Sequence, residues 1–176
     1  MSEPSAADYD IDNLVARSRA LAGLLPSQPA QAAEPRTKTA IVACMDCRLD
    51  VIAIFGLTHG DAHILRNAGG VISDDVERSL VLSQRRLGTR NIVLVHHTQC
   101  GLQGIDEGRF FSDLETETGL RPSWPLHAFN DVEADVRHSI TRLRQSPFLL
   151  DTDHIRGFVY DVENCQLNEV ESEVLR

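Results

Sequence analysis

Short apolar segments of strand length alternate with helix-like segments through the middle of this chain, and this alternation limits the fold more than any other feature. The strand-like runs cover residues 39–44, 62–66 and 91–96, and the intervals between them hold helix-like segments at 49–57 and 74–87. Ser73 is the expected N-cap of the second of these helices, and Gly88 lies just past its end. A strand, a helix and a second strand at this spacing form a βαβ unit with parallel strands. We therefore predict an α/β fold, a single domain in which helices flank a central, mostly parallel sheet.

The second half of the chain continues this pattern less regularly. It begins with an acidic stretch that contains two prolines and for which no regular element is predicted. Residues 129–144 follow as an amphipathic helix, with Asn130 as its expected cap. Residues 156–162 and 167–170 then form a predicted pair of strands that closes the domain.

The N-terminal part of the chain has a different composition. Apolar spacing predicts a helix over about residues 11–25, and Pro26 ends it. A linker rich in proline, alanine and glutamine follows up to Pro35 and is unsuited to a regular helix. We predict an N-terminal helical arm, residues 1–36, followed by an α/β domain, residues 37–176. The apolar face of the arm helix is expected to pack on another subunit or, as an alternative, on its own domain.

The charge balance limits the partners of this chain. Its 176 residues suit one domain, and 17 Lys and Arg against 26 Asp and Glu give a net charge of −9. Such a charge disfavours binding to nucleic acid or to an anionic membrane. No apolar run reaches the ~20 residues that cross a bilayer, and the start of the chain lacks the features of a secretory signal. We expect a cytoplasmic protein that binds neither nucleic acid nor a membrane.

Chemically reactive residues gather where two predicted strands end. The first strand runs into Cys44-Met-Asp46-Cys47-Arg48, and the third runs into His96-His97-Thr-Gln-Cys100-Gly101. Sites in parallel sheets form beyond the carboxyl ends of the strands. If these two strands are neighbours, Cys44, His97 and Cys100 can bind one metal ion; this donor set favours zinc and leaves a fourth position open. The alternative is that the two cysteines are small buried thiols and His97 is a core histidine.

Three motifs, taken together, resemble those of the β-class carbonic anhydrases, most of all their compact bacterial and archaeal members. They are Cys44-x-Asp46-x-Arg48, Arg66-Asn-Ala-Gly and His97-x-x-Cys100-Gly, in this order and spacing. The resemblance implies one Zn²⁺ per chain, held by Cys44, His97 and Cys100, and reversible hydration of CO₂ to bicarbonate by attack of zinc-bound hydroxide. It also implies a homodimer or a dimer-based oligomer, with active sites near the subunit interface.

The resemblance further assigns roles to residues beside the metal. Asp46 and Arg48 match a catalytic dyad in which the aspartate either takes the fourth zinc position or turns away to pair with the arginine, and so gates the site. The walls of the substrate pocket are implied to include Asn67, Ala68, Gly69, Gly70 and Gly101. Two positions depart from the family pattern, since Gln99 stands where relatives often have aspartate and Cys47 stands where alanine or serine is common.

The ligand charges lead to an expected pH dependence. Two thiolates cancel the charge of Zn²⁺, so the centre should acidify its water less than a site with three histidines does. We therefore expect activity that rises with pH and an acid limb above about pH 7.

Three other functions fit parts of the pattern. A thiol oxidoreductase would use Cys44 and Cys47, but it leaves the His97-x-x-Cys100 pair unexplained. A structural zinc module would keep Asp46 or Cys47 permanently in the fourth position. Carbon disulfide or carbonyl sulfide hydrolases of the same family use the same zinc set, so the motifs do not separate these substrates from CO₂.

A phosphate-binding role is rejected for one loop, and two further residues are interpreted as structural. The loop at residues 66–70 lacks the pattern of a phosphate-binding loop, and Asp74 and Asp75 at the next helix start would repel an anion. His96 should point to the opposite face of its strand from His97. Cys165 is expected to be a turn residue between the last two strands.

Overall fold

The computed structural model describes residues 10–22, 24 and 33–171, and the chain divides into two compact units, Met1–Ala32 and Ala33–Arg176. The first unit contains helix α1 (Ile11–Ala22). The sequence predicts this helix up to about residue 25, whereas the described helix ends at Ala22. Residue 23 and the segment 25–32, which holds most of the predicted linker, lie outside the described residues.

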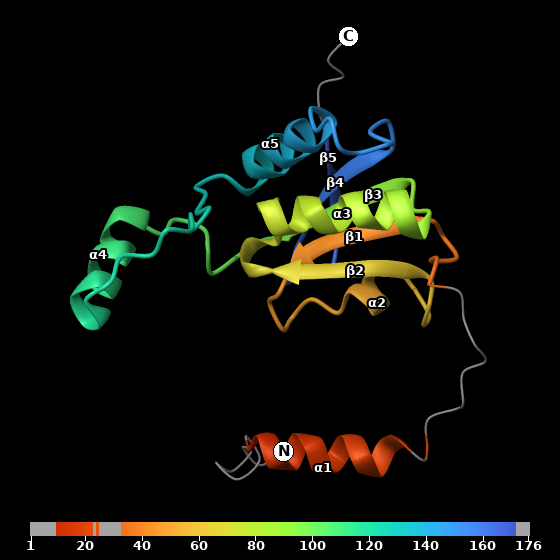
Figure 1. Ribbon diagram of the computed structural model, residues 1–176, viewed down its shortest axis with the longest axis horizontal. Helices are drawn as coiled ribbons and strands as arrows, with labels where there is room; N and C mark the ends of the chain where they lie inside the picture. Colours follow the sequence, from red (N-terminus) through yellow and green to blue (C-terminus); the bar gives the residue numbers. More distant parts are fainter. Residues whose placement is uncertain (1–9, 23, 25–32, 172–176) are drawn as a thin grey trace. The chain divides into compact units, whose positions relative to one another are not determined.

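The second unit is built on a five-stranded sheet. Its strands are β1 (Thr39–Cys44), β2 (Ala62–Asn67), β3 (Asn91–His97), β4 (Ile155–Tyr160) and β5 (Leu167–Val170). They lie in the order β2-β1-β3-β4-β5, and the first four are parallel, whereas β5 runs antiparallel to β4 (Figure 1). The predicted α/β fold with a mostly parallel sheet is confirmed, and β1 and β3 are neighbours.

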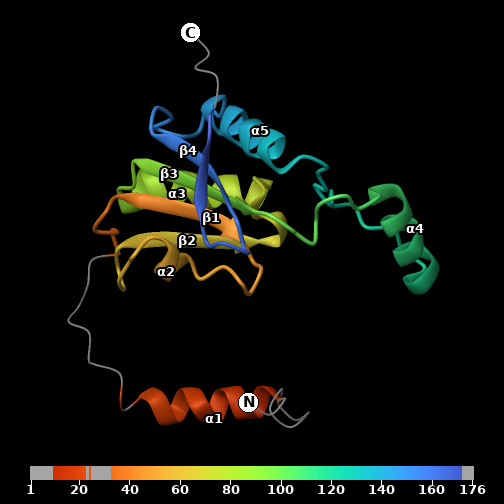
Figure 2. The ribbon, with the colours of Figure 1, turned by 180° about the vertical axis from the view of Figure 1, so that it is seen from behind.

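Helices cover both faces of this sheet (Figure 1 and Figure 2). Helices α3 (Asp74–Leu87) and α5 (Val132–Arg144) share one hydrophobic core with alternate residues of β1, such as Val42. The short helix α2 (Val51–Ile54) shares a second core with the intervening residues, such as Ala43. Successive side chains of a strand point to opposite faces, so a strand covered on both faces needs a continuous apolar run. This requirement explains the sequence of β1.

The helix ends follow local capping rules, with two differences from the sequence predictions. Helix α3 begins after Ser73, whose hydroxyl accepts from the Val76 N–H, and ends at Gly88 in the left-handed conformation, as predicted. Helix α5 is capped by Asp131, which accepts from the Ala134 N–H, so the predicted cap Asn130 was wrong by one residue. Helix α2 is shorter than the predicted 49–57, because Asp50 caps its start and Phe55 caps its end directly after Ile54.

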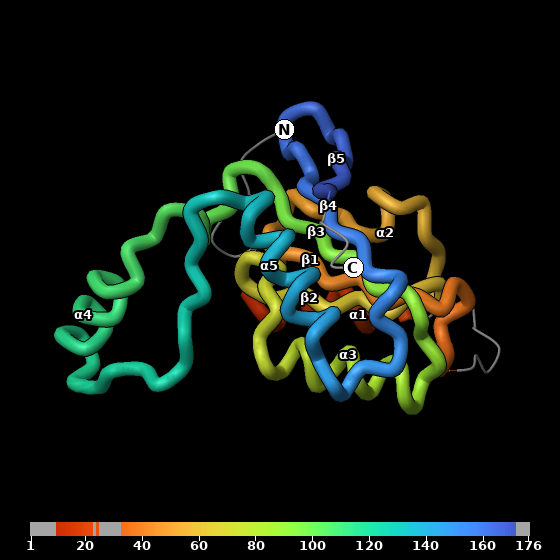
Figure 3. The backbone as a smooth tube through the Cα atoms, turned by 90° about the horizontal axis from the view of Figure 1, so that it is seen from above, coloured from red at the N-terminus to blue at the C-terminus, as the bar shows by residue number. Residues whose placement is uncertain are grey.

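The acidic stretch for which no regular element was predicted contains helix α4 (Glu107–Thr118), and that expectation was wrong. Asp106 caps its start and Gly119 adopts the left-handed conformation at its end. Figure 3 shows α4 standing away from the sheet. Its aromatic contacts are local, since Phe111 packs against Phe110 and Trp124. Across the described residues, no helix combines the length and the apolar character that a membrane span requires.

Candidate metal centre

Three potential metal ligands meet at the carboxyl end of the sheet. Cys44 is the last residue of β1, His97 is the last residue of β3, and Cys100 follows three residues after His97. Because β1 and β3 pair in parallel, their ends lie side by side. One ligand atom from each residue lies within 4.8 Å of the other two, and all three side chains are buried. The structure thus brings the three predicted ligands together.

The imidazole of His97 is oriented as a metal ligand. Its Nδ1 lies 2.8 Å from the carbonyl oxygen of Thr98, which only accepts, so Nδ1 donates and Nε2 carries a free lone pair. Within the described part of the chain, this Nε2 is buried and has no hydrogen-bond partner. A buried nitrogen without a partner is costly, and a metal ion at this position would satisfy it.

The two sulfur atoms have a separation that suits zinc. The Sγ atoms of Cys44 and Cys100 lie 4.0 Å apart. Two sulfurs bound to one tetrahedral zinc at ~2.3 Å would lie about 3.8 Å apart. Soft thiolates together with an imidazole are the donors that zinc prefers. The distances and the chemistry of the donors therefore both fit a zinc ion.

The contact between the sulfurs separates the ionisation of the two thiols. The hydrogen bond from Cys100 lowers the pKa of Cys44 to about 4, against the opposing effect of burial. The same contact, together with burial, raises the pKa of Cys100 well above its usual value. One thiolate is thus formed at neutral pH, and the second sulfur keeps its proton until a metal ion displaces it.

Asp46 and Arg48 form a close ion pair beside the three ligands. The Nε and backbone N–H of Arg48 each donate to Asp46 Oδ1 over 2.9 Å, and Nη2 donates to Oδ2 over 2.7 Å. Asp46 Oδ2 also lies 3.8 Å from His97 Nε2. The hydrogen bonds from Arg48 hold the pKa of Asp46 well below its usual value. The carboxylate therefore stays ionised, next to the metal position but turned toward Arg48.

Arg48 has further acceptors on the β3 side of the site. Its Nη2 donates to the carbonyl oxygen of Gln99 over 3.1 Å, and its Nη1 donates to Gln99 Oε1 over 3.4 Å. The Gln99 amide nitrogen in turn donates to Glu163 Oε1 over 2.6 Å. Gln99, one of the two positions at which the sequence departs from the family pattern, thus contacts Arg48 directly.

Comparisons with known proteins agree with this geometry. A family model described as carbonic anhydrase matches residues 39–124. The β-carbonic anhydrase 1 of Mycobacterium tuberculosis is 48% identical over 136 residues, which cover 77% of this chain and 83% of the relative. The chain belongs to the β-carbonic anhydrase family.

Other relatives of this β-carbonic anhydrase family member include proteins named carbon disulfide hydrolase as well as carbonic anhydrases. A carbon disulfide hydrolase of Acidithiobacillus thiooxidans is 32% identical over 148 residues, covering 72% of this chain and 74% of the relative. The crystal structure of a carbonic anhydrase from Streptococcus mutans superposes with a TM-score of 0.84 at 40% identity, covering 91% of this chain and 96% of the other.

A small, largely apolar pocket of this family member opens next to two of the predicted ligands, Cys44 and Cys100. It has a volume of about 300 Å³, and its lining includes Ala68, Gly69 and Gly101 among the expected pocket residues. Asn67 and Gly70 lie outside the lining, since the Asn67 amide donates to the Val71 carbonyl and Gly70 packs behind β1. The lining also includes two residues that sequence analysis missed, Met45 and Leu102.

Gly70 occupies a position in this loop that leaves no space for a side chain. With φ of +73°, a Cβ at Gly70 would lie 2.9 Å from the backbone nitrogen of Cys44 and 3.0 Å from the carbonyl oxygen of Val95. Only glycine allows this approach, and it adopts the left-handed conformation readily. The loop can therefore pack directly against the two strands that carry the ligands.

Two residues support the ligands without having been assigned a role from sequence. Arg66 donates from Nε to the Cys44 carbonyl over 3.0 Å and from Nη2 to the Asp46 carbonyl over 2.6 Å, so it holds the ligand loop. Thr98 orients His97 as described above. The role of Arg66 could have been inferred from its position near the carboxyl end of β2, next to β1, where its register partner is Ala43.

The remaining cysteines and His96 lie outside the converging group. Cys47 and Cys165 are exposed, and Cys165 occupies the turn between β4 and β5 with φ of +60°. Because Cys44 is buried against Cys100 while Cys47 is exposed, the geometry does not favour a Cys44–Cys47 redox pair. His96 faces the α5 side, where its Nε2 lies 2.7 Å from Asp135 Oδ2.

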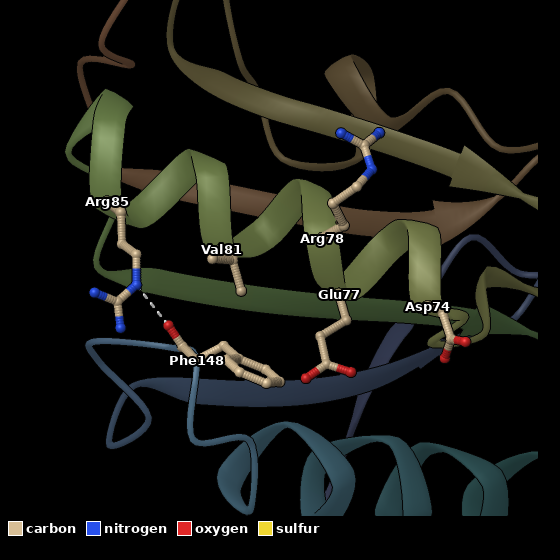
Figure 4. Close-up of a pocket in the computed structure, with 6 residues that line it drawn as sticks. All are labelled: Asp74, Glu77, Arg78, Val81, Arg85 and Phe148. Carbon is tan, nitrogen blue, oxygen red and sulfur yellow. Dashed lines mark hydrogen bonds between the residues drawn. The ribbon is translucent and has the colours of Figure 1, made fainter.

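A hollow of about 500 Å³ lies along the outer side of α3, away from this chemistry (Figure 4). Its lining consists of Asp74, Glu77, Arg78, Val81, Arg85 and Phe148. Arg85 Nε donates to the Phe148 carbonyl across one end of it. The lining contains neither cysteine nor histidine, so this hollow does not compete with the metal centre as the reactive site.

Proposed function

We propose that this chain catalyses the reversible hydration of CO₂ to bicarbonate with one Zn²⁺ held by Cys44, His97 and Cys100. The observation that carries the proposal is the convergence of two sulfurs and one buried imidazole nitrogen at the ends of β1 and β3. That nitrogen has no hydrogen-bond partner among the residues that the structure describes. A zinc ion bound there would acidify water and so supply the nucleophile that CO₂ hydration needs near neutral pH. The 48% identity to a protein named β-carbonic anhydrase 1 supports this choice.

The protein residues have distinct roles in this proposal. The Asp46 carboxylate, 3.8 Å from His97 Nε2, accepts a hydrogen bond from the attacking water and so orients its lone pair toward the substrate. Arg48 holds Asp46 in this orientation through two side-chain hydrogen bonds. When this pairing is lost, Asp46 competes for the metal position instead.

The pocket fits a small, uncharged substrate. Ala68, Gly69, Gly101 and Leu102 present aliphatic or backbone surface, and the pocket opens next to both cysteines. CO₂ is linear and apolar, so it needs space and exclusion of competing water more than it needs hydrogen-bond donors. The accessible pocket also favours a catalytic centre over a structural zinc module. Cys47, which would be the fourth ligand and third sulfur of such a module, is exposed and lies outside the converging group.

Hydrolysis of carbon disulfide or carbonyl sulfide is the second candidate function. It is supported by relatives at 32% identity that are named carbon disulfide hydrolase. These substrates have the same linear shape as CO₂, so the metal centre alone does not separate them. The higher identity to β-carbonic anhydrase 1 is the reason that CO₂ is preferred here.

The proposal also includes a homodimer or a dimer-based oligomer in the cytoplasm. Apolar side chains on and after α4 are exposed within one chain, as with Trp124 at 54%. Four cysteines without a disulfide suit a reducing compartment.

Stopped-flow measurement of CO₂ hydration by the zinc-loaded protein, from pH 6 to 9, tests this function. We expect kcat/KM to rise with pH along an acid limb above about pH 7. Two thiolates would neutralise the zinc charge, so a water bound to the metal would lose its proton at a higher pH than it does at a site with three histidines. A parallel assay of carbon disulfide hydrolysis separates the two candidates. Absence of CO₂ hydration at pH 9, or a flat profile over this range, would contradict the proposal.

A further inference from the structure

The side chain of Gln99 lies between a cation and an anion at the edge of the metal centre. Its Oε1 accepts from Arg48 Nη1 over 3.4 Å, and its Nε2 donates to Glu163 Oε1 over 2.6 Å. The Gln99 carbonyl oxygen accepts from Arg48 Nη2 over 3.1 Å. A continuous path of contacts therefore leads from the β4–β5 turn through Gln99 and Arg48 to Asp46.

The two charged groups fix the direction of the Gln99 amide. A guanidinium only donates hydrogen bonds, and a carboxylate only accepts them. The amide satisfies both groups only with its oxygen toward Arg48 and its nitrogen toward Glu163. The reversed amide would place N–H groups against the guanidinium and an oxygen against the carboxylate. Glu163 thus ensures that Arg48 meets an acceptor.

Strand pairing holds the two ends of this arrangement in place. The Thr98 N–H donates to the Tyr160 carbonyl over 3.0 Å, and the Val162 N–H donates to Thr98 Oγ1 over 3.2 Å. The second of these bonds joins Val162 and Thr98, the residues immediately before Glu163 and Gln99. Within the turn, the Glu163 N–H donates to Asp161 Oδ1 over 2.9 Å. The distance between Gln99 and Glu163 is therefore set by hydrogen bonds that backbone N–H groups donate to one backbone carbonyl and to two side-chain oxygens.

We propose that Gln99 and Glu163 are positioning residues that hold Arg48 on Asp46 and thereby keep Asp46 off the metal position. This inference rests on the proposed function, since it assigns a cause to the orientation of the dyad. A neutral amide at position 99 gives Arg48 an acceptor without offering a second carboxylate. Glutamate there would compete with Asp46 for the guanidinium and release Asp46 toward the metal.

Reversing the charge of Glu163 distinguishes the proposed positioning role from the direct attraction of an anion by an added positive charge. In Glu163→Lys, the ammonium group attracts Gln99 Oε1 and turns the amide nitrogen toward Arg48, which weakens the hold on Asp46. The experiment titrates azide into the cobalt(II)-loaded protein at pH 7.5 and follows the visible spectrum. Azide binds only to molecules in which Asp46 leaves the metal position free. Its apparent affinity therefore decreases when the fraction of such molecules decreases. We expect binding about tenfold weaker than in the wild type, at unchanged cobalt content.

The added positive charge alone would strengthen binding of the azide anion, which is the opposite result. Gln166→Lys, a cation in the same turn at an exposed side chain, is the matched control and should leave the affinity equal or higher. In an Asp46→Ala background, Glu163→Lys should no longer weaken azide binding, because no carboxylate remains to take the position. Gln99→Glu provides a second test and should weaken azide binding and CO₂ hydration by a similar factor.

The outcomes separate the inference from the function on which it rests. If wild-type protein neither binds azide at cobalt nor hydrates CO₂, the proposed function fails. If the wild type does both, but Glu163→Lys and Gln99→Glu bind azide as tightly as the wild type or more tightly, the function stands and the positioning role is wrong. Weakening that persists in the Asp46→Ala background would also overturn it.

Discussion

The imidazole of His97 takes its direction from one hydrogen bond, in which Nδ1 donates to the Thr98 carbonyl oxygen. That bond fixes the tautomer and leaves Nε2 facing two sulfurs and the Asp46 carboxylate. Arg66 acts in the same way on the loop after Cys44, through two backbone carbonyls. At the scale of single residues, the reactive groups are therefore oriented by neighbours that make no contact with the metal position themselves.

Replacing Asp46 separates metal binding from turnover. In Asp46→Ala the three ligands are untouched, so zinc content by elemental analysis should remain at one per chain. Turnover of CO₂ should fall about a hundredfold, because the group that orients the attacking water is lost. Asp113→Ala, which removes an exposed carboxylate on α4, should have no effect. Wild-type turnover in Asp46→Ala would remove Asp46 from the mechanism.

The opposite pKa shifts of the two thiols predict how zinc binding depends on pH. The pKa of Cys44 is lowered to about 4, so it is already a thiolate above pH 7, whereas the raised pKa of Cys100 keeps its proton on the sulfur. Zinc must displace that proton, so its affinity should fall as the pH is lowered. Calorimetry in buffers of different ionisation enthalpy should show about one proton released from the two thiols per zinc at pH 8. Affinity independent of pH would contradict these shifts.

At the scale of elements, glycines set how closely helices and loops approach the sheet. Gly70 lets its loop touch the backbone of both ligand strands. On β4, a Cβ at Gly157 would collide with side-chain atoms of Val136 and Ile140. Helix α5 therefore packs against β4 at a distance that no other residue at this position would permit.

A methyl group at Gly157 should destabilise the domain. Gly157→Ala inserts a Cβ into the contact with Val136 and Ile140, and such overpacking costs ~1–3 kcal/mol of the free energy of unfolding. Urea denaturation followed by circular dichroism measures the change. The same substitution at Gly108, in the first turn of α4, should be neutral or stabilising, because alanine favours helix. Equal stability of Gly157→Ala and the wild type would show that α5 can shift without cost.

The comparison of sequence and structure at this scale shows which signals are local. The strands and α3 follow from apolar runs, capping residues and the βαβ rule, so they could be predicted. The adjacency of β1 and β3 entered the sequence analysis only as a condition for the metal site, because strand order depends on long-range packing. Helix α4 was missed because its apolar residues pack among themselves rather than on the sheet. The contact of Gln99 with Glu163 spans 64 positions and depends on the β4–β5 turn, so no local pattern could indicate it.

At the scale of the whole molecule, the sheet places its chemistry at one end and leaves apolar surface elsewhere. Pocket and ligands lie beyond the carboxyl ends of β1 and β3. Phe110, Leu120 and Trp124, on and after α4, are exposed at 36%, 75% and 54% within one chain. Large apolar side chains gathered on a projecting segment are typical of surfaces that a protein partner covers.

A second copy of the chain is the partner that we expect. Sedimentation equilibrium of the full chain at micromolar concentration should give a dimer or a multiple of it. Exchanging Leu120 and Trp124 for serine should weaken the association by at least about tenfold, because it removes large apolar side chains from the surface that the partner is expected to cover. Matched serine substitutions at Phe148 and Leu150, which are equally exposed outside α4, provide the control. A monomeric wild-type protein would contradict the expectation.

The central claim is that Cys44, His97 and Cys100 bind one zinc ion and leave its fourth position to a light atom. X-ray absorption at the zinc edge measures this set directly on the purified protein. The account predicts one zinc per chain with two sulfurs at ~2.3 Å and two nitrogen or oxygen neighbours at ~2.0–2.2 Å. A shell of three or more sulfurs, or a folded protein that binds no zinc, would contradict it.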